Sequence, residues 1–284
     1  MDIIGFGTAG CNIAKNFEVY PQYKVHYLDV GLRGKNKYAL QKSDTMEDAE
    51  KNAPKFPRLV KKIKEQVTFI CAGSGITSGS ILAFLEQIKH LKITLIYVIP
   101  DLDFLSGKAK QRESLTRGVL QQFARSGLFE NIYLLDNTKM AEIFGGLAIT
   151  EYHKKINHLI SNSYHMLNYL KNTDSVMTSV SSPSEVNRIA TLGVYDMDEQ
   201  VEKYFYDIEN TREKHFYFAF NESTLDENKD LLNNISKQIK NARQAESIVV
   251  SYDITATTYE KNFAYIEAYT NFVQGEKIVD NGPE

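Results

Sequence analysis

The sequence predicts an α/β protein with a parallel-sheet domain, one long helix, and a smaller α/β domain with a mixed sheet. Three observations support this. Short apolar runs alternate with helix-like stretches over residues 1–148, which is typical of a parallel sheet with helices on both faces. Residues 149–172 resemble a single helix. Residues 173–273 return to strands with one long helix among them, and residues 274–284 form a short polar tail.

The first domain follows a strand-and-helix rhythm. The runs expected to form strands are MDIIGFG, KVHYLDV, VTFICAG, ITLIYVIP and NIYLLDN. The stretches expected to form helices are CNIAKNF, ILAFLEQIKHL and residues 107–126. Residues 31–58 are polar without a clear period, so we expect a loop there.

The long helix and the second domain have different patterns. Within residues 149–172, apolar side chains recur at helical spacing from Ile156 to Leu170. Ser182, Pro183 and Glu185 match an N-cap, a first-turn proline and a capping box, which predicts a helix start. KHFYFAF, ESIVVSYDIT and NFAYIEAYTNF are expected strands, and a charged helix is expected over residues 224–242.

Composition limits the class of protein. The 284 residues carry a formal net charge of −3, which disfavours a dedicated nucleic-acid binder. Cys11 and Cys71 form neither a disulfide framework nor a metal-ligand spacing, which fits a reducing compartment. The longest apolar stretch, ITLIYVIP, is too short to span a bilayer. We therefore expect a soluble, cytoplasmic protein.

The first glycine loop is GFGTAG, with Gly5, Gly7 and Gly10 in a G-x-G-x-x-G pattern between a strand and a helix. Backbone N–H groups at such a helix start bind phosphate. Asp29 ends the next strand, where a ribose-binding acid is expected in a Rossmann-like nicotinamide site. The pattern alone leaves three alternatives: a nicotinamide cofactor, another phosphate ligand, or a tight turn without a ligand.

A second glycine loop, CAGSGITSGS, also joins a strand to a helix. Its glycines let backbone N–H groups approach phosphate oxygens, and its hydroxyls add donors. Two such loops at the carboxyl ends of neighbouring parallel strands form a cradle for a longer phosphate chain. No Gly-Lys-Ser/Thr sequence is present in this loop, which argues against a P-loop NTPase.

The segment GSGITSG (residues 73–79) resembles the G-G-G-T-G-S/T-G signature of the tubulin/FtsZ family. Four positions agree and three differ, namely Ser74, Ile76 and Thr77. GFGTAGCN is similar to the family's G-x-G-x-x-G-x-N. The resemblance extends over about residues 1–273, and the chain looks most like the compact, divergent members found in phages and plasmids. It implies a GTP-binding domain, a central helix and a C-terminal domain that includes the activation loop.

The resemblance also implies a GTP/GDP site, with Mg²⁺ held mainly through phosphates rather than by protein ligands. Tyr152 is expected to stack on guanine, and Asn137 and Asn157 to contact its edge. Without the resemblance, Tyr152 and Asn157 would be ordinary helix residues. The implied nucleotide-binding residues are Gly7, Thr8, Ala9, Gly10, Asn12, Gly73, Ser74, Gly75, Ile76, Thr77, Ser78, Gly79, Arg112, Asn137, Tyr152 and Asn157.

For activity, the resemblance implies a head-to-tail filament that hydrolyses GTP to GDP at the subunit interface. Glu185 and Asp174 are the candidate catalytic acids, although a capping-box role also explains Glu185. Ser182 stands where the family carries its first acid. The expected partner is the chain itself, with nucleic acid contacted only through an adaptor. A non-polymerising or hydrolysis-deficient relative and an NAD-dependent oxidoreductase remain alternatives.

Overall fold

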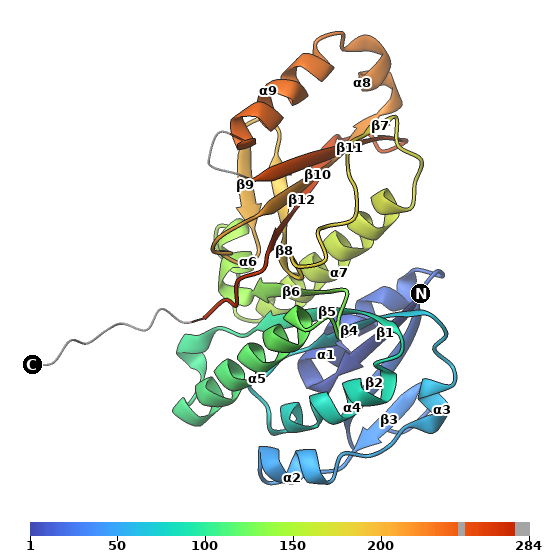
Figure 1. The fold of residues 1–284 in the computed structure, drawn as a ribbon, viewed down its shortest axis with the longest axis vertical. Coiled ribbons are helices and arrows are strands. Elements are labelled where there is room, and N and C mark those ends of the chain that lie inside the picture. The colour runs from blue at the N-terminus through green and yellow to red at the C-terminus, as the bar shows by residue number, and fades with distance from the viewer. Residues whose placement is uncertain (244–247, 276–284) are drawn as a thin grey trace, which may run out of the picture.

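A computed structural model describes residues 1–243 and 248–275 of the protein (Figure 1). Its strands join in one sheet in the order β3-β2-β1-β4-β5-β6-β8-β12-β10-β11-β7, with β9 paired to β8. The strands are β1 (Asp2–Phe6), β2 (Lys24–Val30), β3 (Lys37–Leu40), β4 (Gln66–Cys71), β5 (Lys92–Ile99), β6 (Asn131–Asp136), β7 (Met177–Thr178), β8 (Ile189–Asp196), β9 (Val201–Tyr204), β10 (Glu213–Asn221), β11 (Val249–Thr257) and β12 (Phe263–Thr270).

The helices lie mostly between consecutive strands. The α-helices are α1 (Gly7–Ala14), α2 (Met46–Lys51), α3 (Pro57–Val60), α4 (Ile81–Ile88), α5 (Gly107–Arg125), α6 (Asn137–Ile143), α7 (Tyr152–Lys171), α8 (Glu222–Glu227) and α9 (Leu231–Arg243). The 3₁₀ helices of the described residues are η1 (Lys15–Val19), η2 (Ile76–Ser80) and η3 (Leu102–Phe104).

The N-terminal half of the sheet is parallel from β3 to β6, as the alternating pattern predicted. Its strands are nearly continuous apolar runs because helices cover both faces. One face packs on α4 and α5 through side chains such as Phe84 and Leu120. The other packs on α1 and α7 through side chains such as Ile13 and Ile160. This arrangement confirms the predicted α/β class.

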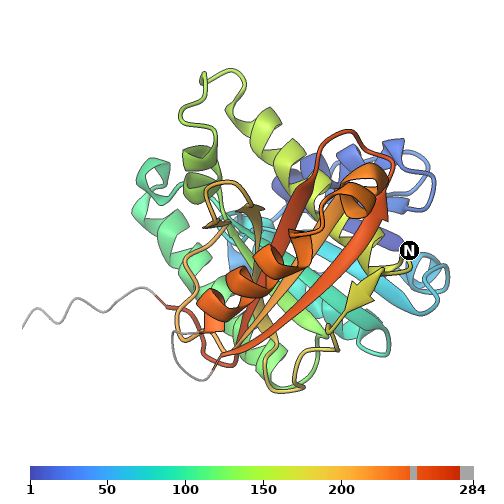
Figure 2. The ribbon, with the colours of Figure 1, turned by 90° about the horizontal axis from the view of Figure 1, so that it is seen from above.

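The C-terminal half of the sheet is mixed, which also agrees with the prediction. Strands β10 and β11 are parallel, while β12 is antiparallel to both β8 and β10. The two halves join through a short parallel pairing of β6 with β8 at Ile132 and Tyr133. Helix α7 lies between the halves, and α8 and α9 lie on the outer side of the C-terminal strands (Figures 1 and 2).

A buried ionic cluster ties α7 to the C-terminal strands. The Nζ of Lys171 at the end of α7 lies 2.7 Å from Oε1 of Glu267, which is fully buried on β12. The hydroxyls of Tyr133 and Tyr217 also donate to this carboxylate. Burial alone raises the pKa of Glu267, but Lys171 and these hydrogen bonds outweigh it, so the pKa lies below its usual value.

Three local predictions were wrong. Residues 31–58 are not simply a loop, since they contain β3, α2 and the start of α3. The single helix over residues 224–242 is two helices, α8 and α9, separated at Asn228–Asp230. No helix starts at Ser182, because residues 182–186 form a loop and turn before β8, where the Ser184 N–H donates to Oε1 of Glu213 at 2.9 Å.

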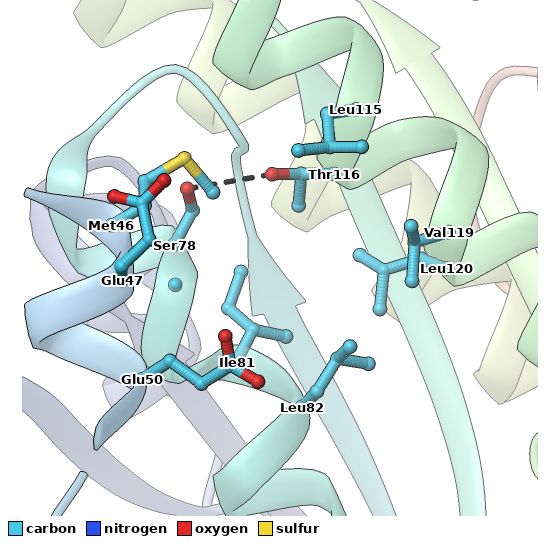
Figure 3. A pocket seen from close by; sticks show the side chains of 11 residues that line it. Met46, Glu47, Glu50, Ser78, Ile81, Leu82, Leu115, Thr116, Val119 and Leu120 are labelled. Carbon is cyan, nitrogen blue, oxygen red and sulfur yellow. Dashed lines mark hydrogen bonds between the residues drawn. The ribbon is translucent and has the colours of Figure 1, made fainter. Parts of the chain in front are cut away.

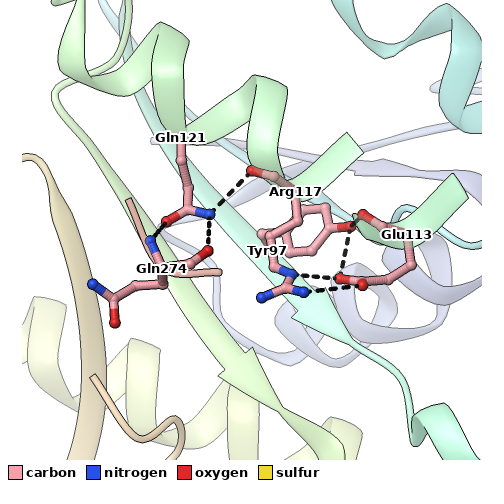
Figure 4. Close-up of polar contacts among 5 residues, drawn as sticks. All are labelled: Tyr97, Glu113, Arg117, Gln121 and Gln274. Carbon is pink, nitrogen blue, oxygen red and sulfur yellow. Dashed lines mark hydrogen bonds and ion pairs between the residues drawn. The ribbon is translucent and has the colours of Figure 1, made fainter. Parts of the chain in front are cut away.

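The end of the described chain differs from a free polar tail. Gln274 is buried, and its backbone amide and carbonyl pair with the side chain of Gln121 on α5 at 2.7 and 2.8 Å (Figure 4). The rest of the expected tail, residues 276–284, lies outside the described residues.

No helix among residues 1–243 and 248–275 is long and apolar enough to cross a bilayer.

Candidate functional site

A cavity of about 460 Å³ opens where β1, β4, β5 and β6 end. The carboxyl edge of a parallel sheet is where ligands bind in open α/β folds. The cavity is lined by Phe6, Gly7, Thr8, Ala9, Asn12, Ile13, Ala72, Ser74, Gly75, Thr77, Val98, Pro100, Asn137, His153 and Asn157. Nine of these are predicted nucleotide-binding residues, and both glycine loops contribute.

The first loop turns directly into α1. Gly7 begins this helix with φ +68°, a left-handed backbone conformation that glycine adopts without strain. The first N–H groups of a helix have no intrahelical acceptor, so they are free to bind an anion. The hydroxyl of Thr8 donates to Oδ2 of Asp29 at 2.9 Å, so Asp29 holds the loop from β2.

Gly10 lies away from the cavity and allows α1 to pack closely on β4. A Cβ at Gly10 would lie 2.2 Å from the carbonyl oxygen of Ile70, far inside contact distance. This is the close helix–strand packing that the third glycine of such a pattern permits. Gly10 therefore sets the position of the helix start rather than lining the cavity.

The second loop faces the first across the cavity. Ser74, Gly75 and Thr77 line the cavity, and a Cβ at Gly7 would lie only 3.4 Å from Oγ1 of Thr77. Arg112 on α5 donates from Nε to the carbonyl oxygen of Ser74 at 2.9 Å. In this conformation Arg112 fixes the loop instead of lining the cavity.

Helix α5 also holds Tyr97 of β5, whose hydroxyl lies next to the second loop; Figure 4 shows the contacts of Tyr97 with α5. The hydroxyl of Tyr97 donates to the backbone carbonyl of Glu113 at 3.1 Å, and Arg117 Nε lies 2.9 Å from Oε1 of Glu113. A Cβ at Gly73 would lie 2.1 Å from this tyrosine hydroxyl. Gly73 is therefore required where the loop crosses the Tyr97 ring, and it does not reach the cavity.

The remaining loop residues turn away from the cavity. The hydroxyl of Ser78 donates to the carbonyls of Gly73 and Gly75 at 3.0 and 2.7 Å, so it stabilises the loop itself. A Cβ at Gly79 would lie 2.2 Å from the carbonyl oxygen of Met46 on α2. Ser78 and Gly79 instead line a separate, mainly apolar cavity of about 220 Å³ between α2, α4 and α5 (Figure 3). Ile76 lines neither cavity.

The opposite end of the cavity is formed by α6 and the start of α7. Asn137 and Asn157, the two residues expected to contact a base, line it, but Tyr152 does not. Its place is taken by His153, whose ring meets the Tyr152 ring edge-on at 5.2 Å. Oδ1 of Asn137 and the Tyr152 hydroxyl are buried without a hydrogen-bond partner among the described residues. Such atoms are uncommon in native proteins, and a bound ligand or water is one explanation for them.

The electrostatics favour binding through backbone amides. None of the described residues lining the cavity is a lysine or arginine. Burial, with repulsion from Asp101 and Asp136, raises the pKa of Tyr152. Burial and Asp29 likewise raise the pKa of Cys11 to about 12, so this thiol is not a nucleophile at neutral pH. Within the described chain no cluster of three His, Cys, Asp or Glu side chains could hold a metal ion.

The two candidate catalytic acids lie far from the cavity. Asp174 follows the end of α7, a 20-residue helix about 30 Å long that begins at the cavity. Glu185 precedes β8 in a loop where Arg188 donates to the carbonyl of Phe129, just before the start of β6. Both acids are exposed. Within one molecule the structure does not bring either of them to the cavity.

Sequence reasoning missed several cavity residues. His153 lies four positions before Asn157, so both fall on the same face of α7. This spacing could have identified His153 as a cavity residue from the sequence. Val98 and Pro100 follow from the carboxyl end of β5 once the strand order is known. Phe6 and Ala72 flank the glycine loops and carry no chemistry of their own.

Comparisons with known proteins identify other proteins that share this fold. No protein-family model matches the chain, and no curated protein gives a significant match. Solved structures match over nearly its full length. FtsZ from M. jannaschii has a TM-score of 0.71 at 13% identity, covering 100% of this chain and 94% of that one. CetZ2 from Haloferax volcanii, in a GTPγS-bound protofilament, has a TM-score of 0.73 at 10% identity, covering 98% and 94%.

TubZ from Bacillus thuringiensis serovar israelensis, in a GTPγS-form protofilament, gives a TM-score of 0.70 at 11% identity, covering 97% of this chain and 87% of that one. Identities this low demonstrate shared architecture only. The chain therefore has the tubulin/FtsZ fold, on a sequence that has diverged far from those of these proteins.

Proposed function

We propose that the chain binds GTP and GDP in the cavity between its two glycine loops and assembles head to tail into filaments that hydrolyse GTP. The observation that carries the proposal is the pair of loops converging on one cavity, whose far end holds an Asn137 oxygen without a hydrogen-bond partner in the described part of the chain. Nucleotide-bound protofilaments of proteins with the same fold add support.

The cavity residues have separate roles. Free N–H groups from Gly7 onward, with the Ser74 and Thr77 hydroxyls, would hold the phosphates. Asn137 and Asn157 would bind the base, because an amide oxygen accepts from the ring N–H and exocyclic amine of guanine. His153 or Tyr152 would cover the base face. Mg²⁺ would neutralise phosphate charge and keep mainly phosphate and water ligands, which fits a cavity without a carboxylate cluster.

Hydrolysis would require a second molecule. The cavity lies at one end of α7, and the exposed Asp174 and Glu185 lie towards the other end. Head-to-tail stacking would bring an acid of one molecule to the cavity of the next, where it would orient water and accept its proton. GTP turnover should therefore rise with protein concentration faster than linearly.

The first experiment identifies the nucleotide. Purified protein is denatured and the released small molecules are separated by chromatography; a guanine nucleotide supports the proposal, and NAD(P) supports the oxidoreductase alternative. Sedimentation with GTP, GDP or no nucleotide then tests assembly. GTP-dependent pelleting is expected, and binding without pelleting would indicate a non-polymerising relative.

The second experiment tests the acids. Glu185→Ala and Asp174→Ala are compared with Glu65→Ala, an exposed glutamate before β4. The acid that positions water should lose GTP turnover while still binding nucleotide and pelleting with GTP. If GTP turnover is unchanged in both variants, neither Glu185 nor Asp174 takes part in hydrolysis.

A further inference from the structure

A wide groove lies at the outer edge of the sheet, beside β3 and α3. Its volume is about 760 Å³, and none of its lining residues lines the nucleotide cavity. The turn before β3 contributes backbone as well as side chains. The lining residues are Gly34, Lys35, Asn36, Lys37, Tyr38, Lys55, Phe56, Pro57, Arg58, Lys61 and Lys62.

The groove concentrates positive charge on an acidic protein. Between Gly31 and Lys64 there are ten lysines and arginines against four acidic residues, whereas the whole chain carries −3. The six cationic side chains of the groove are all exposed. None forms an ion pair with a carboxylate of the described residues; Lys62 donates only to the Tyr38 hydroxyl, at 3.4 Å. Mutual repulsion of these cations is relieved when an anion binds among them.

The same groove borders an open sheet edge. Within residues 1–243 and 248–275, β3 is the terminal strand and pairs only with β2, over the four residues 37–40. An edge strand presents N–H and C=O groups that an added strand can pair with, over about 13 Å for four residues. The backbone of residues 34–38 lines the groove, so a bound chain would lie next to these groups.

We propose that this groove binds an acidic, extended segment of a partner protein, which adds to β3 as a further strand. Its carboxylates would pair with the groove cations, and its backbone would pair with β3, as in other strand-addition complexes. The site and its occupant do not depend on nucleotide binding.

The aromatic residues of the groove favour a peptide over nucleic acid. Tyr38 and Phe56 meet edge-on at 5.8 Å and pack against the buried core, so their faces are not free to stack on bases.

The test measures fluorescence anisotropy of labelled probes with the full chain and no added nucleotide. The main probe is a short peptide of alternating glutamate and threonine. Three comparisons accompany it: the same peptide with lysine for glutamate, oligothymidylate of equal charge, and a proline peptide. In the proline peptide two adjacent residues, one glutamate and one threonine, are proline, so that at least one N–H facing β3 is lost, and one glutamate is added at an end to keep the charge. The glutamate–threonine peptide should bind most tightly, and the proline peptide about fivefold or more weakly, because proline has no N–H for the added strand.

The variant Lys55→Glu/Lys61→Glu should weaken binding of that peptide about tenfold or more, while Lys237→Glu/Lys240→Glu on α9 makes the same charge change and should leave it nearly unchanged. All four lysines are exposed, so both variants should fold, which circular dichroism checks. Equal binding of the proline peptide would overturn strand addition, and tighter binding of oligothymidylate would replace the peptide with nucleic acid. Absence of binding by every probe, or equal loss in both variants, would overturn the groove as a site.

Discussion

Gly10→Ala tests whether the first loop is positioned by backbone packing, and Gly118→Ala is its matched control. Both glycines lie in helices, α1 and α5, where alanine is intrinsically favoured by about 1 kcal/mol. A Cβ at Gly118 would meet nothing within 4 Å, whereas at Gly10 it would lie 2.2 Å from the Ile70 carbonyl oxygen. That carbonyl belongs to β4, which is held between β1 and β5 and cannot easily move.

The two substitutions should therefore have opposite signs. Overpacking costs about 1–3 kcal/mol and is most severe against backbone, so we expect a net loss of about 2 kcal/mol for Gly10→Ala. Gly118→Ala should raise the free energy of unfolding by about 0.5–1 kcal/mol. Differential scanning fluorimetry should show a midpoint lowered by about 4 °C for the first and raised by about 2 °C for the second. If Gly10→Ala is as stable as Gly118→Ala, α1 does not pack on β4 as described.

Three further predictions concern the site and the buried polar groups. Asn137→Ala should weaken GTP binding in isothermal titration calorimetry by about 10-fold and leave the melting midpoint of the nucleotide-free protein nearly unchanged, because Oδ1 has no hydrogen-bond partner among the described residues. A large loss of stability would show that Oδ1 does have a partner. Lys171→Met should lower the free energy of unfolding in urea by about 3 kcal/mol, because it leaves the buried Glu267 carboxylate without its cation. Restored stability in Lys171→Met/Glu267→Gln would confirm that cause. Burial lowers the pKa of His215, so the unfolded chain binds more protons just below pH 6.5 and stability should fall as the pH drops through that value. His215→Gln should flatten this slope, and an unchanged slope would assign the protons to other groups.

Much of the fold follows from the sequence because the parallel strands are continuous apolar runs bounded by glycine or polar residues. β8 was missed because Gly193 interrupts its sequence, IATLGVYD, although Thr191 itself suits a strand. Both are explained by distant partners: the Thr191 hydroxyl donates to the carbonyl of Leu134 at 2.9 Å, and a Cβ at Gly193 would lie 2.7 Å from the carbonyl of Lys203. A strand pattern cannot show such contacts.

The short elements in residues 31–58 were missed for another reason. β3 has four residues and lies at an edge, so its apolar signal is weak. α2 did carry a readable signal, because Thr45 caps it by accepting from the Asp48 N–H at 3.1 Å. The helix expected at Ser182 fails for the opposite reason: a cap motif was present, but no apolar helical face followed it.

The sequence predicted two glycine loops at one site, and the structure divides their glycines into two groups. The pattern located both loops, and the structure brings Gly7 and Gly75 to the cavity. Gly10, Gly73 and Gly79 instead relieve contacts with residues remote in sequence, on β4, β5 and α2. A loop that must bend sharply and a backbone that must pack closely both favour glycine. A single sequence therefore cannot tell which glycines line the cavity and which only permit close packing.

A crystal structure of the chain with GTPγS tests most directly whether the two glycine loops hold a guanine nucleotide. We expect triphosphate density between the N–H groups of Gly7 and Thr8 and the loop of Ser74 and Thr77, with guanine within hydrogen-bond distance of Asn137. Density for the ligand at any other surface, or a cavity that accepts NAD(P) in preference to GTPγS, would contradict this expectation.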